Sequence, residues 1–306
     1  MKKIAQILIV LILGAFISGC ATTNQGKYTQ KWNQGEPEYL QLDKGITVRY
    51  VRTGNGPPLL LLHTIRTQLD YFEKLVPLLS DQYQVIALDL PGHGQSSIAP
   101  EAYTEEFFRQ AVSEFITKQD LKDVTLVGES IGGVLALTVS TELPDRVQRI
   151  VSLNPYDYGE KFGGGIRRSR NGWMVGLFNI FGSYTFEPRF VTAAVMAGGF
   201  HDRTRLPEGL LTEFSLTGKR AGYRRAEYSV FKNWKTWTDA RQLYSRIKTP
   251  VTLIYGSDDW SKIEEREQNQ KAIANAELIT IEKSGHFTAL ENPEEVAKII
   301  LSGRIR

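Results

Sequence analysis

Short, unbroken runs of apolar residues recur along most of the chain. Each run has four or five residues, which is typical of a strand buried on both faces of a parallel sheet. Stretches with apolar residues at helical spacing separate most of these runs. The runs lie at 59–62, 85–88, 124–127, 150–153, 251–255 and 278–281, and the helical stretches at 70–79, 104–117, 131–143, 263–274 and 294–301. This alternation predicts an α/β fold, with a mostly parallel central sheet and helices on both faces.

Two segments depart from the alternation. Residues 38–43 and 46–52 are extended stretches around an Asp43-Lys44-Gly45 turn, and they predict a β-hairpin. Residues 155–246 contain no recognisable buried strand, so we expect an inserted, mainly helical cap between core segments 38–154 and 247–306. This cap segment has 15 Lys/Arg and 8 Asp/Glu, a charge of +7. The charge is compatible with an anionic or amphiphilic substrate, with an anionic membrane surface, or with an ordinary solvated face.

Composition limits the function classes. With 306 residues, 42% of them hydrophobic, the chain is long enough for one large domain or a domain with a cap. A net charge of +3 does not indicate a nucleic-acid partner. Four scattered histidines and a single cysteine do not form a recognisable metal-ligand set, and we expect no cofactor. Nothing in the sequence indicates an oligomeric state.

The first nineteen residues have the layout of a secretory signal. Met1-Lys2-Lys3 is basic, and 4–17 is almost wholly apolar but shorter than the ~20 residues that span a bilayer. Residues 1–19 are therefore a predicted signal peptide, and the polar segment 20–37 is a predicted tether.

The lone cysteine stands at the end of this signal. Ile17-Ser18-Gly19-Cys20 resembles the lipobox of bacterial lipoproteins, which implies cleavage before Cys20 and lipid attachment to its sulfur. The alternative is an ordinary signal peptide that ends by chance at a cysteine. Ala21 is not the aspartate that such proteins use for inner-membrane retention, so the resemblance implies an outer-membrane anchor facing the periplasm. As Cys20 has no second cysteine to pair with, no intramolecular disulfide is possible.

Gly128-Glu129-Ser130-Ile131-Gly132 has the form G-x-S-x-G between an apolar strand and an apolar helix. A sharp strand-to-helix turn lifts the serine above the sheet, and flanking glycines relieve close contacts there. We therefore expect Ser130 to be a nucleophile, which needs a histidine base.

His286 follows the last expected strand and precedes the last helix. Because loops at the carboxyl ends of parallel strands converge over the sheet, His286 is the expected base. The orienting acid should lie between the serine and the histidine in the chain, where Asp258 and Asp259 both follow a strand.

These motifs, in this order, resemble the α/β-hydrolase family over nearly all of 38–303. Asp89-Leu90-Pro91-Gly92-His93-Gly94-Gln95-Ser96 matches the family's D-x-P-G-x-G-x-S turn, and Leu62-His63 its H-G segment. The resemblance implies an α/β-hydrolase fold and selects Asp259 as the acid. His93 in the D-x-P-G turn is expected to be structural.

The oxyanion loop departs from the family pattern. The resemblance implies an oxyanion hole formed by the amides of Ile131 and Ile65. Thr64 stands where the family usually has glycine, which tolerates backbone dihedrals that threonine does not. Arg66 and Gln68 either bind a polar substrate group or are surface residues at the start of a helix.

These residues favour hydrolysis of a carboxylic ester or thioester, small or lipid-like, through an acyl-enzyme. Relatives that open epoxides or displace halides use aspartate where this chain has Ser130. Carbon–carbon bond hydrolysis and perhydrolysis use the same triad and remain open. A non-catalytic envelope lipoprotein that retains the fold is a further open alternative.

Overall fold

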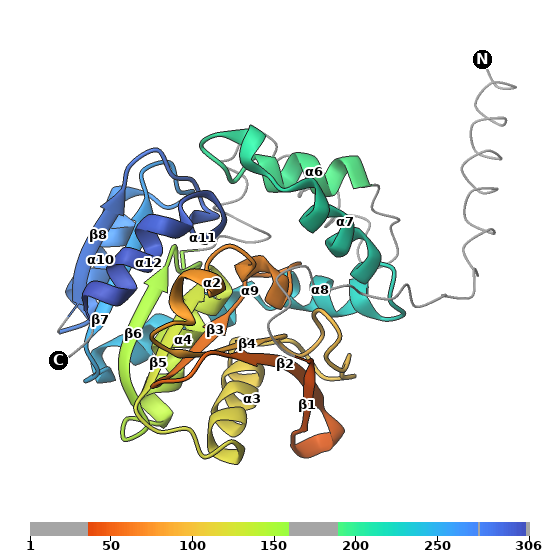
Figure 1. Ribbon diagram of the computed structural model, residues 1–306, viewed down its shortest axis with the longest axis horizontal. Helices are drawn as coiled ribbons and strands as arrows, with labels where there is room; N and C mark the ends of the chain where they lie inside the picture. The colour runs from red at the N-terminus through yellow and green to blue at the C-terminus, as the bar shows by residue number, and fades with distance from the viewer. Residues whose placement is uncertain (1–35, 159–188, 275, 304–306) are drawn as a thin grey trace, which may run out of the picture.

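An eight-stranded sheet forms the centre of the computed structural model, which describes residues 36–158, 189–274 and 276–303 (Figure 1). Its strand order is β1-β2-β4-β3-β5-β6-β7-β8. β1 and β2 pair antiparallel and so do β2 and β4, whereas all later neighbours are parallel. The strands are β1 (Glu38–Gln41), β2 (Thr47–Thr53), β3 (Pro58–Leu62), β4 (Gln84–Leu88), β5 (Val124–Glu129), β6 (Val147–Leu153), β7 (Val251–Gly256) and β8 (Ala276–Ile281). The expected hairpin and the mostly parallel sheet are confirmed.

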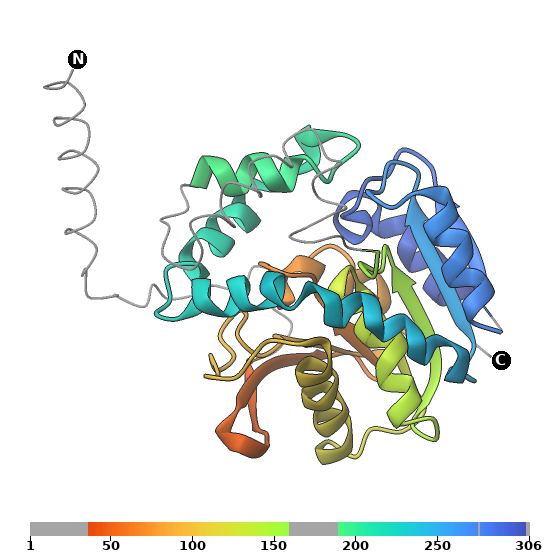
Figure 2. The same cartoon turned by 180° about the vertical axis from the view of Figure 1, so that it is seen from behind.

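Helices cover both faces of this sheet (Figures 1 and 2). Two separate apolar clusters lie under them, one on each face. One face carries α3 (Glu105–Lys118), α4 (Ile131–Glu142), η6 (Ala240–Arg246) and α10 (Ile263–Ala272); the other carries η2 (Leu69–Phe72), α2 (Val76–Leu79), α11 (Thr288–Glu291) and α12 (Pro293–Ser302). In α4 the first ten residues are all buried, as expected for a helix that is apolar on every side.

The helix expected over 70–79 is broken into η2 and α2. Pro77 stands in the first turn of α2, where its missing N–H costs nothing. The pyrrolidine ring of Pro77 also prevents one continuous helix over 70–79. Proline lacks the N–H for a backbone hydrogen bond, and its ring collides with the preceding turn. Apolar spacing alone did not reveal this break.

The described part of the cap segment is mainly helical. It comprises α6 (Arg189–Ala197), η5 (Arg203–Arg205), α7 (Glu208–Thr217), α8 (Tyr223–Lys232), α9 (Trp234–Asp239) and η6. Helices α6 to α8 lie together beside the core (Figure 2), whereas α9 contacts α3, and η6 contacts α4 and α10. The last two elements of the segment are therefore packed on the core.

Three arginines of the cap segment donate to backbone carbonyls of the core. Arg205 donates to the carbonyl of Glu291 at 2.7 Å, Arg220 to that of Ser96 at 2.9 Å, and Arg225 to that of Ala99 at 2.6 Å. Hydrogen bonds from a charged donor are stronger than those between neutral groups. Part of the positive charge thus fastens the cap to the core, a use that the sequence did not indicate.

Over the described ranges, no helix combines the length and apolarity that a membrane crossing requires. The predicted signal peptide, Cys20 and most of the predicted tether lie outside the described residues.

Candidate active site

Ser130 sits in the sharp turn between β5 and α4. Its backbone has φ 59° and ψ −117°, a strained conformation for a residue with a side chain. A Cβ at Gly128 would overlap the carbonyl of Gly132, and a Cβ at Gly132 would overlap that of Leu62. Both glycines of the motif are therefore required by close backbone contacts, which hold the serine in place.

The structure brings Ser130, His286 and Asp259 into one hydrogen-bonded chain. The Ser130 hydroxyl lies 3.0 Å from His286 Nε2, and His286 Nδ1 lies 2.5 Å from Asp259 Oδ1. All three residues are buried. With the proton on Nδ1 donated to the carboxylate, Nε2 is free to accept the serine proton.

The neighbouring Asp258 points elsewhere. Its side chain is half-exposed and pairs with His201 of the cap segment. Of the two candidates that the sequence left open, Asp259 is the one in contact with His286.

The environment of Asp259 favours its ionised form. Burial acts to raise the pKa of this carboxyl, but the His286 ring and the hydroxyl and amide of Ser261 outweigh burial and hold the pKa below its usual value. Arg266 in turn donates to the Ser261 hydroxyl at 2.9 Å. An ionised acid at this position can stabilise an imidazolium.

Sequence reasoning missed the role of Glu129, which lies buried beneath the elbow. Its carboxylate accepts from the amides of Thr288 (2.6 Å) and Ala289 (3.2 Å), from Asn154 (3.0 Å) and from the Tyr71 hydroxyl (2.5 Å). Burial raises the pKa of Glu129 to about 7, against the opposing effect of its hydrogen-bond donors and of His286. Glu129 thus joins the serine turn directly to the segment after His286. The sequence signal for this role of Glu129 was a charged residue between a buried strand and a buried helix.

The two expected oxyanion donors line the same pocket as Ser130. Within the described part of the chain, neither the amide of Ile131 nor that of Ile65 has a protein acceptor. Available donors beside the nucleophile are what an oxyanion hole requires. The residue of this loop in the left-handed region is Arg66, with φ 64°, and not Thr64. The threonine therefore fits the loop without backbone strain.

His63 supports this loop, and His93 packs beside His63. His63 Nδ1 lies 2.7 Å from the Thr64 carbonyl, and its Nε2 accepts from the amide of Leu90 at 3.0 Å. Burial lowers the pKa of His63 and of His93 to about 4, so both rings are neutral. His93 is buried beside His63, with 5.2 Å between ring centroids, and its Nδ1 lies 3.0 Å from the Pro91 carbonyl. This placement agrees with the structural role expected for it.

Gln68 fits neither of the two alternatives that the sequence left open, a contact with the substrate or a surface position. Its side chain is fully buried and contacts Thr217 at 2.5 Å and Asp70 at 3.3 Å. Arg66 does line the pocket, but its Nε donates to Glu227 of α8 at 3.2 Å. The chain turns back into the core after Arg66. The Arg66 side chain therefore lines the pocket, whereas the Gln68 side chain is buried in the core.

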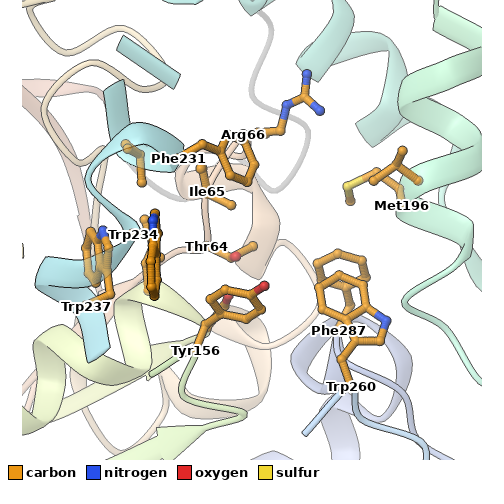
Figure 3. Close-up of a pocket in the computed structure, with 14 residues that line it drawn as sticks. Thr64, Ile65, Arg66, Tyr156, Met196, Phe231, Trp234, Trp237, Trp260 and Phe287 are labelled. Carbon is orange, nitrogen blue, oxygen red and sulfur yellow. The ribbon is translucent and has the colours of Figure 1, made fainter. Parts of the chain in front are cut away.

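Ser130 lines an apolar pocket, which Figure 3 shows with its aromatic walls. Trp234, Trp237 and Phe231 form one side, and Met196, Trp260 and Phe287 form the other. The described lining residues are Thr64, Ile65, Arg66, Ser130, Ile131, Tyr156, Val195, Met196, Val230, Phe231, Trp234, Trp237, Trp260 and Phe287. Such a pocket removes water from a bound apolar group beside the nucleophile.

A model of the alpha/beta hydrolase fold family matches residues 57–293. The chain belongs to this family. It is accordingly a hydrolase of this fold. Among its relatives is the (E)-2-((N-methylformamido)methylene)succinate hydrolase of Acinetobacter baylyi, 28% identical over 260 residues, covering 84% of this chain and 94% of that protein.

Solved structures share the fold. The meta-cleavage product hydrolase of Pseudomonas fluorescens superposes with a TM-score of 0.73 at 18% identity and covers 87% of this chain and 96% of its own. A bacterial membrane phospholipase A has a TM-score of 0.73 at 18% identity, covering 99% of this chain and 97% of its own. These likenesses support the fold and leave the substrate of this hydrolase open. Among the described residues, no three His, Cys, Asp or Glu side chains are grouped so as to hold a metal ion.

Proposed function

We propose that this hydrolase cleaves a carboxylic ester or thioester through a covalent acyl-enzyme on Ser130. The observation that carries the proposal is the hydrogen-bonded chain from the Ser130 hydroxyl through His286 to Asp259 at the base of an apolar pocket. A serine hydroxyl is a weak nucleophile unless a base takes its proton, and here the base lies within 3.0 Å of it.

In the proposed mechanism, His286 Nε2 takes the hydroxyl proton as Ser130 Oγ attacks the substrate carbonyl. The amides of Ile131 and Ile65 donate to the oxyanion of the tetrahedral intermediate. His286 then gives its proton to the departing alcohol or thiol, which leaves an acyl-Ser130 ester. Water attacks this ester with His286 again as the base, and His286 then returns the proton to Ser130 Oγ as the carboxylic acid departs. Asp259 stabilises the imidazolium at each stage.

The first test is labelling of the full-length protein with a fluorophosphonate and location of the adduct by mass spectrometry. We expect an adduct on Ser130 that is absent in His286→Ala, together with turnover of p-nitrophenyl esters or acyl thioesters that Ser130→Ala abolishes. Labelling without ester or thioester turnover, combined with cleavage of a vinylogous diketone, would instead identify a carbon–carbon bond hydrolase. A folded protein that does not label would support a non-catalytic lipoprotein.

We further propose that Cys20 carries the lipid anchor of this protein in the outer membrane. The support is the sequence alone: the signal-like segment 1–19, the lipobox-like Ser18-Gly19-Cys20 and the absence of aspartate at position 21. Cells fed an alkyne-bearing palmitate should label the wild-type protein and not Cys20→Ala. Fractionation of a Gram-negative host should place it in the outer membrane, and Ala21→Asp should move it to the inner membrane.

A further inference from the structure

Asn154 directly follows β6 and is fully buried. Its backbone has φ 43°, in the left-handed region that asparagine adopts more readily than most residues with a side chain. In the sheet β6 lies between β5 and β7, so its carboxyl end stands between the serine turn and the segment that leads to Asp259. One side chain at this point can reach the loops that follow the neighbouring strands.

The side-chain amide of Asn154 contacts all three segments that carry the triad. Its Oδ1 accepts from the amide of Gly256 at 2.9 Å, at the end of the strand that leads to the acid. Its Nδ2 donates to the carbonyl of His286 at 3.0 Å and to the carboxylate of Glu129, the neighbour of Ser130, also at 3.0 Å. A single amide thus joins the loops of the nucleophile, the acid and the base.

The partners of this amide fix its orientation. A backbone N–H faces Oδ1, and a backbone carbonyl faces Nδ2, so the reversed amide would set donor against donor and acceptor against acceptor. Thr288 Oγ1 lies 2.8 Å from Nδ2 as a further acceptor, so the two hydrogen atoms of Nδ2 serve three acceptors. Asn154 is therefore held firmly, and it can hold its partners in turn.

The backbone on either side of Asn154 holds Ser130. The amide of Ser130 donates to the carbonyl of Leu153 at 2.9 Å, and the amide of Tyr156 donates to the carbonyl of Ser130 at 3.2 Å. Asn154 is thus connected to the nucleophile through its neighbours in the chain and to the backbone of His286 through its side chain. Both ends of the 3.0 Å contact between Ser130 Oγ and His286 Nε2 are tied to this one buried residue.

We propose that Asn154 is a positioning residue, which keeps His286 at hydrogen-bonding distance from Ser130. The proposal rests on the proposed function, in which His286 takes the proton of Ser130. Transfer of this proton requires close alignment, and a displacement of about 1 Å can lower a rate by about 100-fold. Asn154 is not one of the described residues that line the pocket. We therefore expect it to act on the chemical steps and not on substrate binding.

Two variants of Asn154 test this role. Asn154→Gly removes the amide and keeps the left-handed backbone without strain. Asn154→Asp retains the acceptor for Gly256 but presents an oxygen, in place of Nδ2, to the carbonyl of His286. Each variant should lower kcat by roughly 10- to 100-fold and leave KM nearly unaltered. Calculation of kcat per fluorophosphonate-reactive site keeps the comparison valid for a destabilised variant.

Asn269 of α10 provides matched controls. Its Nδ2 likewise donates to a buried carboxylate, that of Asp157 at 2.9 Å, and to the Tyr255 hydroxyl at 3.0 Å. Asn269→Ala and Asn269→Asp therefore remove contacts of the same kind from another buried network. They should lower the free energy of unfolding, as the variants at position 154 do, and leave kcat unaltered.

The rate of fluorophosphonate labelling is a second readout, because labelling requires an activated Ser130 but no ester turnover. Labelling should slow in Asn154→Gly by about the same factor as kcat. A folded variant at position 154 with the kcat and labelling rate of the wild type would overturn the positioning role. An equal loss of kcat in the Asn269 variants would also overturn it. Slower labelling of Asn154→Gly, with a wild-type protein that labels but hydrolyses neither esters nor thioesters, would overturn the proposed function and retain the positioning role.

Discussion

The indole of Trp260 lies flat against the imidazole of His286, with ring centroids 3.9 Å apart and planes inclined by 15°. Trp260 directly follows Asp259, so one short turn supplies both the carboxylate at Nδ1 and the surface against the ring face. The Trp260 Nε1 donates to the Gly198 carbonyl of the cap segment at 3.3 Å, which fixes the indole in its plane. We infer that Trp260 positions His286 and stabilises its cationic form.

Replacement of Trp260 should therefore slow the chemical steps. An aromatic face near a cation contributes about 0.5 to 2 kcal/mol, so Trp260→Ala should lower kcat by roughly 2- to 30-fold. Trp260→Phe keeps a ring face and should retain most of the activity. A small sulfonyl fluoride, which does not fill the pocket, should label Ser130 more slowly in the alanine variant. A change confined to KM, with unaltered labelling, would show that Trp260 acts only as a wall of the pocket.

The two adjacent aspartates should differ sharply on substitution. Asp259→Asn replaces the acceptor of the His286 Nδ1–H and favours the wrong tautomer, so kcat should fall on the order of 10³- to 10⁴-fold. Asp258→Asn breaks only an exposed pair with His201, and such pairs contribute about 1 kcal/mol or less. Ester hydrolysis by both variants, each checked for folding by circular dichroism, tests this ranking. The reverse ranking would make Asp258 the acid.

Glu129 should make stability depend on pH. Its pKa is raised from 4.5 to about 7 in the folded protein, so the folded state binds this proton more tightly than the unfolded state. The stabilisation is complete below pH 4.5 and is lost as pH rises through 7, with a loss of about 3 kcal/mol. Glu129→Gln lacks this dependence.

Urea unfolding of both proteins between about pH 4.5 and pH 8 checks the prediction about Glu129. The stability advantage of the wild type over Glu129→Gln should shrink across this range by that amount. Contributions from His63 and His93 cancel, because both proteins contain them. A constant difference would mean that Glu129 stays ionised throughout.

Arg49 should be one of the most stabilising side chains of the core. Its Nε lies 2.7 Å from Asp89 Oδ2, with both side chains almost fully buried. Burial acts to raise the pKa of Asp89, but Arg49 outweighs it and keeps the carboxyl ionised. Arg49→Met would leave the Asp89 charge buried without its partner. The free energy of unfolding should therefore fall by about 3 to 5 kcal/mol.

Arg52→Met on the same strand is the matched control for Arg49→Met. The ion pair of Arg52 with Glu38 is more exposed, so Arg52→Met should lower the free energy of unfolding by about 1 kcal/mol or less. Urea unfolding measures both variants. Similar losses would show that the buried pair contributes no more than the exposed one.

Features with a short-range cause were predictable from the sequence. The buried strands were recognisable because runs of four or five apolar residues between turns are too short for helices. The break at Pro77 had a local cause as well, yet apolar spacing concealed it. The serine turn was visible because only glycine fits on either side of it. Glu129 was visible in the sequence, but its partners come from three other segments.

By itself, the sequence determined the order of strands and helices, the position of the serine turn and the candidate base and acids, because each depends on residues that are neighbours in the chain. The tertiary structure decided which side chains meet. Asp258 and Asp259 are adjacent, yet the turn directs one to the cap and the other to His286. Arg66 and Glu227 are 161 residues apart and meet only because the cap folds back over the core loop. Side-chain direction and long-range contact arise from the packing of whole elements, which no local pattern encodes.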